Sequence, residues 1–219
     1  MSAPFVIALD GPAAAGKSSV GLGVARALGL GYFDTGLLYR ALTWLALTCD
    51  IEPADGERLT RLVDDLRIQV DSDGRVYRDG VDITGRLHEP SVSTAVSEVS
   101  AHAAVREAMR PAQRALIRAP GLVMAGRDIG TVIVPEAPLK IWLSASLEER
   151  ARRRAAQTGE PVSRVLEAMH ARDRYDASRD VAPMARANDA VTLETDGVPL
   201  ESVIARIVKL ARERGACGA

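Results

Sequence analysis

Cysteine and histidine are scarce in this chain, and neither is arranged to hold a metal. Cys49 and Cys217 stand far apart, and His88, His102 and His170 are scattered. A zinc site needs several such ligands at close spacing, so the sequence excludes a zinc-type cluster. Two isolated cysteines also give no disulfide framework, and we expect free thiols in a reducing cytoplasm.

Long hydrophobic runs are absent as well. The apolar stretches, such as FVIAL and GLVMA, are far shorter than the roughly 18 residues of a membrane span. No basic stretch precedes the first apolar run, so we expect no signal peptide. The formal net charge of −1 gives no general attraction to nucleic acid or to an anionic membrane. We therefore expect a cytoplasmic protein without either partner, and the 219 residues suit one domain or one core with insertions.

Lysine is the third scarce residue. Of the 28 basic residues only Lys17, Lys140 and Lys209 are lysines, and the others are arginines. Because arginine is the ordinary cation of this chain, a cluster of arginines carries little information by itself. The place of Lys17 in the sequence is therefore more informative than a count of charges.

Lys17 belongs to a glycine-rich motif of the form Gly-x-x-x-x-Gly-Lys-Ser, which spans residues 11–18. The apolar run FVIALD precedes this loop, as expected of a buried strand, and the helical run SSVGLGVARALGL follows it. A strand, a glycine-rich loop and a helix in this order are the context of a P-loop. Small residues let backbone amides approach a phosphate, and the helix N-terminus adds partial positive charge. The predicted ATP-binding residues are Gly11, Pro12, Ala13, Ala14, Ala15, Gly16, Lys17, Ser18 and Ser19.

Two residues of the loop have predicted chemical roles. The ammonium of Lys17 is a mobile charge for the β- and γ-phosphates of ATP. The hydroxyl of Ser18 is placed to bind Mg²⁺, which we expect as the cofactor with ATP as co-substrate. The alternative is a flexible helix entry that binds no ligand.

The scarcity of lysine also tests which kind of P-loop protein this is. A GTPase reads guanine with an Asn/Thr-Lys-x-Asp signature, but Leu139 precedes Lys140 and Val208 precedes Lys209. The signature is absent, and the length of the chain argues against a large motor or transporter ATPase. A kinase of a small molecule is the interpretation that remains.

The stretch GYFDTGLLYRAL carries a second group of polar residues. In one interpretation Asp34 and Thr35 cap the helix that begins near Leu37. In the other, Tyr39 and Arg40 face an anionic acceptor across from the P-loop.

The stretch AGRDIGTVIVPEAPLKIWL carries a third group. Two strand-like runs lie around a Gly-Arg-Asp turn, so Arg127 and Asp128 follow the end of a predicted strand. Ligands bind at that end of the strands in an open parallel sheet. A surface salt bridge is the alternative.

The motifs DGPAAAGKSS, DTGLLYR, AGRDIGTVIVPEAPLKIWL and RDRYDASRDVAPM together resemble those of bacterial cytidylate kinases, in order from about Phe5 to Asp196. The resemblance implies an α/β fold, in which a P-loop kinase core has a parallel sheet flanked by helices. It also implies a monophosphate-binding insertion with a small antiparallel sheet, and a helical lid. The implied activity is phosphoryl transfer from ATP to CMP and dCMP, and the implied state is a monomer.

We expect a single domain over residues 1–219. Turn signals at Asp73-Gly74 and Asp79-Gly80 separate alternating strands in the insertion. We expect the helical region that follows to be interrupted near residues 101–104 and at Pro111. The predicted core comprises residues 1–36, 118–145 and 181–219, the insertion residues 37–117, and the lid residues 146–180.

The lid is predicted to consist of two helices separated by TGEP. Ser146 and Glu149 form a capping-box pattern at the start of the first helix. Most of the arginines that follow are expected to be solvated or paired with Glu148 and Glu149, and one or two to reach the ATP phosphates. These arginines are Arg150, Arg152, Arg153 and Arg154.

The resemblance also implies residues that bind the acceptor. Ser97 and Arg106 match a serine and an arginine that read cytosine, although Ser97 can also be an ordinary exposed helix residue. Arg172, Asp176 and Arg179 share a helical face and match residues that contact the monophosphate, with an intrahelical ion-pair ladder as the alternative. The predicted acceptor-binding residues are Asp34, Thr35, Tyr39, Arg40, Ser97, Arg106, Arg127, Asp128, Arg172, Asp176 and Arg179.

The predicted reaction needs no side-chain base. The second pKa of a phosphate monoester is about 6, so the attacking oxygen is already ionised at neutral pH. Asp128 or Asp34 is a candidate acidic partner for Mg²⁺. Two alternatives stay open, namely another small-molecule P-loop kinase and a non-catalytic nucleotide switch. The predicted catalytic residues are Lys17, Arg40, Arg127 and Arg179.

Overall fold

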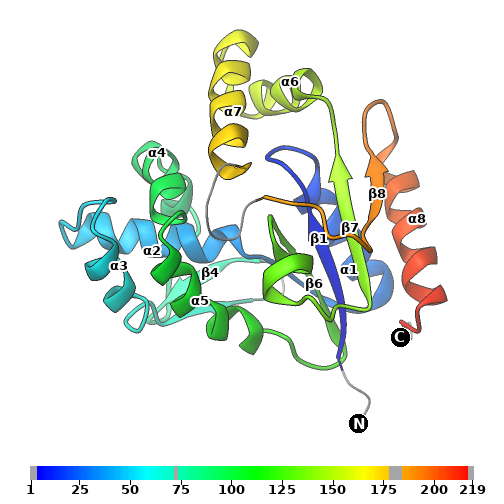
Figure 1. The fold of residues 1–219 in the computed structure, drawn as a ribbon, viewed down its shortest axis with the longest axis horizontal. Helices are drawn as coiled ribbons and strands as arrows, with labels where there is room; N and C mark the ends of the chain where they lie inside the picture. Colours follow the sequence, from blue (N-terminus) through cyan, green and yellow to red (C-terminus); the bar gives the residue numbers. More distant parts are fainter. Residues whose placement is uncertain (1–3, 72–73, 178–183, 217–219) are drawn as a thin grey trace. The chain divides into compact units, whose positions relative to one another are not determined.

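The computed structural model describes residues 4–71, 74–177 and 184–216. The chain divides into two compact units (Figure 1). The first unit comprises residues 1–33 and 117–219, and the second comprises residues 34–116. Among the residues that the structure describes, no helix combines the length and the apolar character needed to cross a bilayer.

A five-stranded sheet in the order β2-β6-β1-β7-β8 is the centre of the first unit. Strand β1 pairs in parallel with β6 and with β7, and β7 pairs in parallel with β8, which confirms the predicted parallel sheet. A strand covered on both faces is expected to be apolar throughout, and residues 6–10 of β1 are all buried. The strands are β1 Phe5–Asp10, β2 Gly31–Asp34, β6 Gly121–Gly126, β7 Leu139–Ser144 and β8 Val191–Glu194.

Helices α1 (Lys17–Leu28) and α8 (Leu200–Glu213) pack against each other beside this sheet (Figure 1). Their apolar side chains join those of the strands in one core, which includes Leu9, Val24 and Ile207. Gly29 ends α1 in the left-handed conformation, with a φ of 64°, as the sequence predicts. The P-loop is thereby held between a central strand and a packed helix.

Helices α6 (Leu147–Thr158) and α7 (Val162–Ala177) lie in the segment that the sequence predicts to be a lid, and both belong to the first unit. They pack against each other through a small apolar cluster that includes Ala151 and Met169. Ala13 and Ala14 of the P-loop pack against the same cluster. The lid helices therefore contact the P-loop directly in this structure.

The second unit contains helices and the predicted small antiparallel sheet, in the order β3-β4-β5. The expected break near residues 101–104 is present, because the helix before it ends at Val99 and the next begins at Ala103. The elements are α2 Gly36–Thr48, α3 Gly56–Leu62, β3 Ile68–Val70, β4 Val76–Arg78, β5 Val81–Asp82, a 3₁₀ turn Arg86–His88, α4 Pro90–Val99 and α5 Ala103–Ala115.

The expected interruption at Pro111 is wrong. Helix α5 continues through Pro111 to Ala115. Proline removes one backbone hydrogen bond from a helix interior, but tertiary packing can compensate for that loss. Met109 and Gln113 are buried on either side of Pro111, and this packing keeps the turn helical.

The run that directly follows the Gly-Arg-Asp turn is also not a strand. Residues Ile129–Ile133 form a single π-helical turn, and the next strand, β7, begins only at Leu139. The carbonyl oxygen of Asp128 accepts hydrogen bonds from the amides of Val132 and Ile133, at 2.8 Å and 3.2 Å. These amides are thereby removed from any strand pairing.

Candidate functional site

The P-loop connects the end of β1 to the start of α1 through a tight backbone path. Ala14 and Gly16 adopt left-handed conformations, with φ values of 57° and 94°. At Gly11 a Cβ atom would collide with the backbone carbonyl of Leu143 in β7, so only glycine fits there. Close packing against β7 is therefore by itself a reason for glycine at the first position of the loop.

Lys17 lies over this loop and is only 7% exposed. Its Nζ atom donates hydrogen bonds to the carbonyl oxygens of Gly11 and Pro12, at 2.8 Å and 2.7 Å. The ammonium is thus held by the first two residues of the loop, while its backbone begins α1. This position suits a cation that meets phosphate at a helix N-terminus.

Arg127 joins the same group from the end of β6. Its Nη1 donates to the carbonyl oxygen of Gly11 at 3.0 Å, so one carbonyl receives donors from both Lys17 and Arg127. Its Nε donates to Oδ2 of Asp176 at 3.2 Å. The structure thus places Arg127 beyond the carboxyl end of β6, and it joins β6, the P-loop and α7.

Asp10, the last residue of β1, is part of this arrangement and was missed by the sequence analysis. Its two carboxylate oxygens accept hydrogen bonds from the amides of Ile129 and Gly130, at 2.9 Å and 2.8 Å. Burial raises the pKa of Asp10 to about 6, although the two amides oppose the rise. The available signal was a charged residue at the end of an otherwise apolar run.

The residues present fit a magnesium ion carried by a nucleotide. Ser18 is exposed in the first turn of α1, and Asp128 is buried at the end of β6 in the same unit. Mg²⁺ prefers hard oxygen ligands and commonly keeps only one or two protein ligands beside substrate phosphates. In the part of the chain described by the structure, no three His, Cys, Asp or Glu side chains are grouped to hold a metal by themselves. Asp34, the other candidate carboxylate, lies in the second unit.

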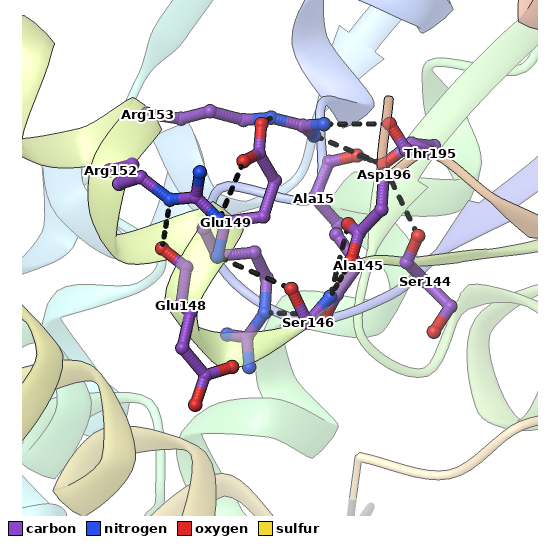
Figure 2. A network of polar contacts seen from close by, with 11 residues as sticks. Ala15, Ser144, Ala145, Ser146, Glu148, Glu149, Arg152, Arg153, Thr195 and Asp196 are labelled. Carbon is purple, nitrogen blue, oxygen red and sulfur yellow. Dashed lines mark hydrogen bonds and ion pairs between the residues drawn. The ribbon is translucent and has the colours of Figure 1, made fainter. Parts of the chain in front are cut away.

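A polar network joins the start of the lid to β8 and the P-loop (Figure 2). Arg153 pairs with Glu149 at 3.0 Å and donates to the hydroxyl and carbonyl oxygens of Thr195, at 3.0 Å and 2.7 Å. The hydroxyl of Thr195 in turn lies 3.4 Å from the carbonyl oxygen of Ala15. Thr195 therefore links Arg153 to the P-loop.

The capping box predicted for α6 is only half formed. The hydroxyl of Ser146 accepts a hydrogen bond from the Glu149 amide at 3.3 Å, as expected. In a complete capping box the Glu149 side chain would accept from the Ser146 amide. Here Asp196 replaces it, and its two carboxylate oxygens accept from that amide at 3.1 Å and 3.0 Å (Figure 2). The hydrogen bond from Ser146 holds the pKa of Asp196 below its usual value. Glu149 is thereby left to pair with Arg152 and Arg153.

Arg150 differs from the solvated arginine that the sequence suggests. It is buried, and its Nη1 lies 2.7 Å from Oδ2 of Asp173 in α7. The same guanidinium donates to the carbonyl oxygens of Ala145 and Ala13, at 3.1 Å and 3.3 Å. Arg150 therefore connects both lid helices and the P-loop.

The structure describes two of the three acceptor residues that are predicted at the end of the lid. Asp176 pairs with Arg127, which lies on a different element. Arg172 lies half-buried in α7. Arg179 lies outside the described residues.

In the second unit, two of the predicted acceptor residues, Arg106 and Tyr39, are in contact. Arg106 in α5 lies over the ring of Tyr39 in α2, 5.4 Å from its centre, and donates to the carbonyl oxygen of Ser100 at 3.0 Å. Arg40 donates to the Leu87 carbonyl and to the Ser93 hydroxyl, at 2.8 Å and 3.1 Å.

The other predicted residues of the second unit lie on its helices or at their starts. Ser97 is half-buried in α4. Thr35 precedes α2, and the neighbouring Asp34 accepts the Gly36 amide at 2.9 Å. A capping contact at the start of α2 is therefore present, through Asp34.

Comparison with known proteins agrees with this geometry. The family model described as "Cytidylate kinase" matches residues 7–213. The cytidylate kinase of Roseiflexus castenholzii is 46% identical, with 98% of this chain and 96% of that protein covered. That of Geobacillus thermodenitrificans is 43% identical, with 98% and 99% covered.

A second kind of relative is longer. The bifunctional pantoate ligase/cytidylate kinase of Synechococcus sp. (strain CC9902) is 43% identical over 95% of this chain, which spans only 45% of that protein. The match over nearly all of this chain, in both kinds of relative, shows that it belongs to the cytidylate kinase family.

Proposed function

We propose that this chain transfers the γ-phosphoryl group of ATP to CMP, forming ADP and CDP, and that dCMP is a second acceptor. The observation that carries the proposal is the convergence of Lys17 and Arg127 on the Gly11 carbonyl, at the carboxyl ends of β1 and β6. Two cations held at a P-loop suit a reaction in which phosphate charge is neutralised. The family supplies the identity of the acceptor.

In this proposal the P-loop, residues 11–19, binds the donor. Its backbone amides and Lys17 bind the β- and γ-phosphates of ATP. Ser18 is the protein ligand of Mg²⁺, with Asp128 as the acidic partner. When bound with ATP, the ion neutralises charge that develops on the phosphates.

The acceptor is bound by arginines, aspartates and hydroxyls. Ser97 and Arg106 read the cytosine edge, with the ring of Tyr39 beneath Arg106. Asp176 accepts hydrogen bonds from the ribose hydroxyls. Binding of the acceptor replaces the ion pair between Asp176 and Arg127, which lie 3.2 Å apart here. Asp34, Thr35, Arg40, Asp128, Arg172 and Arg179 complete the proposed acceptor set.

No side chain needs to remove a proton in this mechanism. The attacking phosphate oxygen is ionised at neutral pH, since the second pKa of the monoester is about 6. The work of the protein is to place this oxygen in line with the γ-phosphorus and to bind the charge that develops. Lys17, Arg40, Arg127 and Arg179 are the proposed catalytic residues. The ammonium of Lys17 supplies a mobile positive charge, and the guanidinium groups of the three arginines bind phosphate through two hydrogen bonds.

In this proposal the lid also excludes water from bound ATP. Its helices already contact the P-loop through Ala13 and Ala14, and through Arg150.

We propose that residues 146–180 are the lid of a single domain. The core of that domain comprises residues 1–36, 118–145 and 181–219, and the insertion residues 37–117. We further propose a cytoplasmic monomer that binds neither nucleic acid nor membranes.

The test is formation of ADP from Mg·ATP with a panel of acceptors: CMP, dCMP, UMP, AMP, GMP and shikimate. We expect strong stimulation by CMP and dCMP, weaker stimulation by UMP, and none by the purine nucleotides or shikimate. Stimulation by another acceptor alone would retain the kinase and overturn the roles of Ser97 and Arg106. Slow ATP hydrolysis that no acceptor stimulates would indicate a nucleotide switch instead.

A further inference from the structure

One buried carboxylate in the first unit has no part in the proposed chemistry. Asp10 is 4% exposed and lies directly before Gly11, whose carbonyl oxygen binds Lys17 and Arg127. Its own side chain binds the amides of Ile129 and Gly130. Asp10 therefore connects the first residue of the P-loop to the turn that carries Arg127.

These contacts lie on both sides of Arg127. On one side, the guanidinium reaches the Gly11 carbonyl at 3.0 Å. On the other side, the chain continues through Asp128 to the two amides that Asp10 holds, at 2.9 Å and 2.8 Å. Backbone amides that turn toward a carboxylate cannot extend β6, and the chain instead forms the π-helical turn Ile129–Ile133. The carboxylate of Asp10 thus holds the backbone that directly follows Arg127 and Asp128.

We propose that Asp10 is a positioning residue for phosphoryl transfer, which fixes the Gly-Arg-Asp turn through two amide hydrogen bonds and so holds the guanidinium of Arg127 in place. The inference rests on the proposed phosphorylation of CMP. It adds a residue that contacts neither substrate and acts through Arg127.

The chemistry of the side chain explains why a carboxylate is needed. An ionised aspartate has two acceptor oxygens, one for each amide, whereas asparagine has one acceptor and one donor group. Burial raises the pKa of Asp10 to about 6, and the nearby Asp128 adds to the rise, while Lys17 and the two amides oppose it. At pH 7.5 the carboxylate is mostly ionised and accepts from both amides. Asp10→Asn therefore removes one hydrogen bond at nearly constant size.

The experiment is a double-mutant cycle on the steady-state kinetics of CMP phosphorylation. Alone, Asp10→Asn is expected to lower kcat by roughly tenfold to a hundredfold, with a much smaller change in the KM for ATP. In the Arg127→Ala background the same substitution is expected to change kcat by less than about twofold, because its effect is transmitted through Arg127. If the two losses multiply, Asp10 does not act through Arg127 and the proposal is overturned.

A matched control separates positioning from lost stability. Ile207→Ala removes a buried side chain of α8 in the same unit and is expected to destabilise the fold. Its effect on kcat should combine independently with Arg127→Ala. If Ile207→Ala also loses its effect in the Arg127→Ala background, the coupling of Asp10 reflects general destabilisation and the proposal is wrong.

A measurement on the unaltered protein keeps the proposal testable even if Asp10→Asn does not fold. The amide proton resonances of Ile129 and Gly130 should shift together as the pH crosses about 6, the pKa of the carboxylate that they bind. Amides that do not follow this titration would contradict the geometry. Because this readout needs no turnover, its failure is distinct from a lack of CMP phosphorylation, which would overturn the proposed function instead.

Discussion

At the residue scale, the buried carboxylate of Asp10 makes the stability of the chain depend on pH in the direction opposite to that of an ion-paired aspartate. In the folded chain its pKa is about 6, against an ordinary value of 3.8. Between these values the folded state binds more protons than the unfolded state. The contribution of Asp10 to the free energy of unfolding therefore falls as the pH rises from about 4 to 6.

Asp10→Asn isolates this contribution. Relative to the variant, the wild-type protein should lose roughly 2 to 3 kcal/mol of unfolding free energy between pH 4 and pH 7, since each unit of pKa difference corresponds to about 1.4 kcal/mol. Urea unfolding of both proteins at several pH values measures the difference. A difference that stays constant over this range would contradict the buried, proton-retaining state of Asp10.

Lys17 gives a second prediction at this scale. Lys17→Ala removes the cation of the P-loop and should lower kcat by about a hundredfold or more, because electrostatic stabilisation of phosphoryl transfer is lost. The fold should be retained, as measured by circular dichroism and urea unfolding. Lys209→Ala, at an exposed position of α8, is the matched control and should retain full activity. Wild-type-like turnover of Lys17→Ala would overturn the catalytic role of the P-loop.

The two residues also show what the sequence could and could not predict at this scale. Lys17 was predicted because its motif fixes the spacing between glycines and lysine, and the structure places it over the P-loop. Asp10 was missed because its partners are backbone amides of Ile129 and Gly130, which leave no mark in the sequence. The pairing of Arg127 with Asp176 was not predicted either, since it depends on how α7 lies against the end of β6.

At the scale of the element, helix α1 contains two glycines whose substitution should have different effects. On helix propensity alone, glycine to alanine stabilises a helix interior by about 1 kcal/mol. At Gly21 a new Cβ atom would meet the ring of Tyr32, with Cδ2 only 2.9 Å away. At Gly23 it would meet the flexible end of Ile204, which can rotate away.

We therefore expect Gly21→Ala to lower the free energy of unfolding by about 1 to 3 kcal/mol, as overpacking does. Gly23→Ala should be close to neutral, because the gain in propensity offsets the repacking of Ile204. Urea unfolding of the two variants compares the same substitution two residues apart in one helix. Equal effects would show that propensity, and not the contact with Tyr32, decides the outcome at Gly21.

Elements with a clear period or a strong turn signal were predicted well. The run FVIALD forms β1, and the helix after the P-loop ends at Gly29, as expected. Pro111 was misjudged because packing of α5 outweighs the missing amide. The π-helical turn Ile129–Ile133 was not predicted because its apolar residues are those of a strand, and hydrogen bonds to Asp10 and Asp128 decide its shape.

At the scale of the whole molecule, the two compact units are expected to divide the recognition of the two substrates. Ser97→Ala changes the second unit, so it should raise the KM for CMP by about tenfold through the loss of one hydrogen bond, and leave the KM for ATP unchanged. Ser91→Ala, an exposed position on the same helix, is the control. An equal loss with every nucleoside monophosphate would show that Ser97 does not read the base.

The insertion of the second unit into the first also has a consequence for the order in which the protein folds during its synthesis. The contacts that define the second unit all lie within residues 34–116. Strand β1, in contrast, pairs with β6 and β7, where Ile7 meets Val123 and Leu139. Domains generally fold as units while the chain emerges from the ribosome.

We expect ribosome-bound chains that expose residues 1–116 to protect residues 34–116 from protease while the segment before them is still cleaved. Protection of residues 5–28 should appear only in longer chains that also expose β7. Early protection of residues 5–28 would contradict this order. The P-loop would then leave the ribosome well before β7 and acquire its shape only after β7 has followed, so a nascent chain would be unable to bind ATP until residues up to Ser144 had emerged.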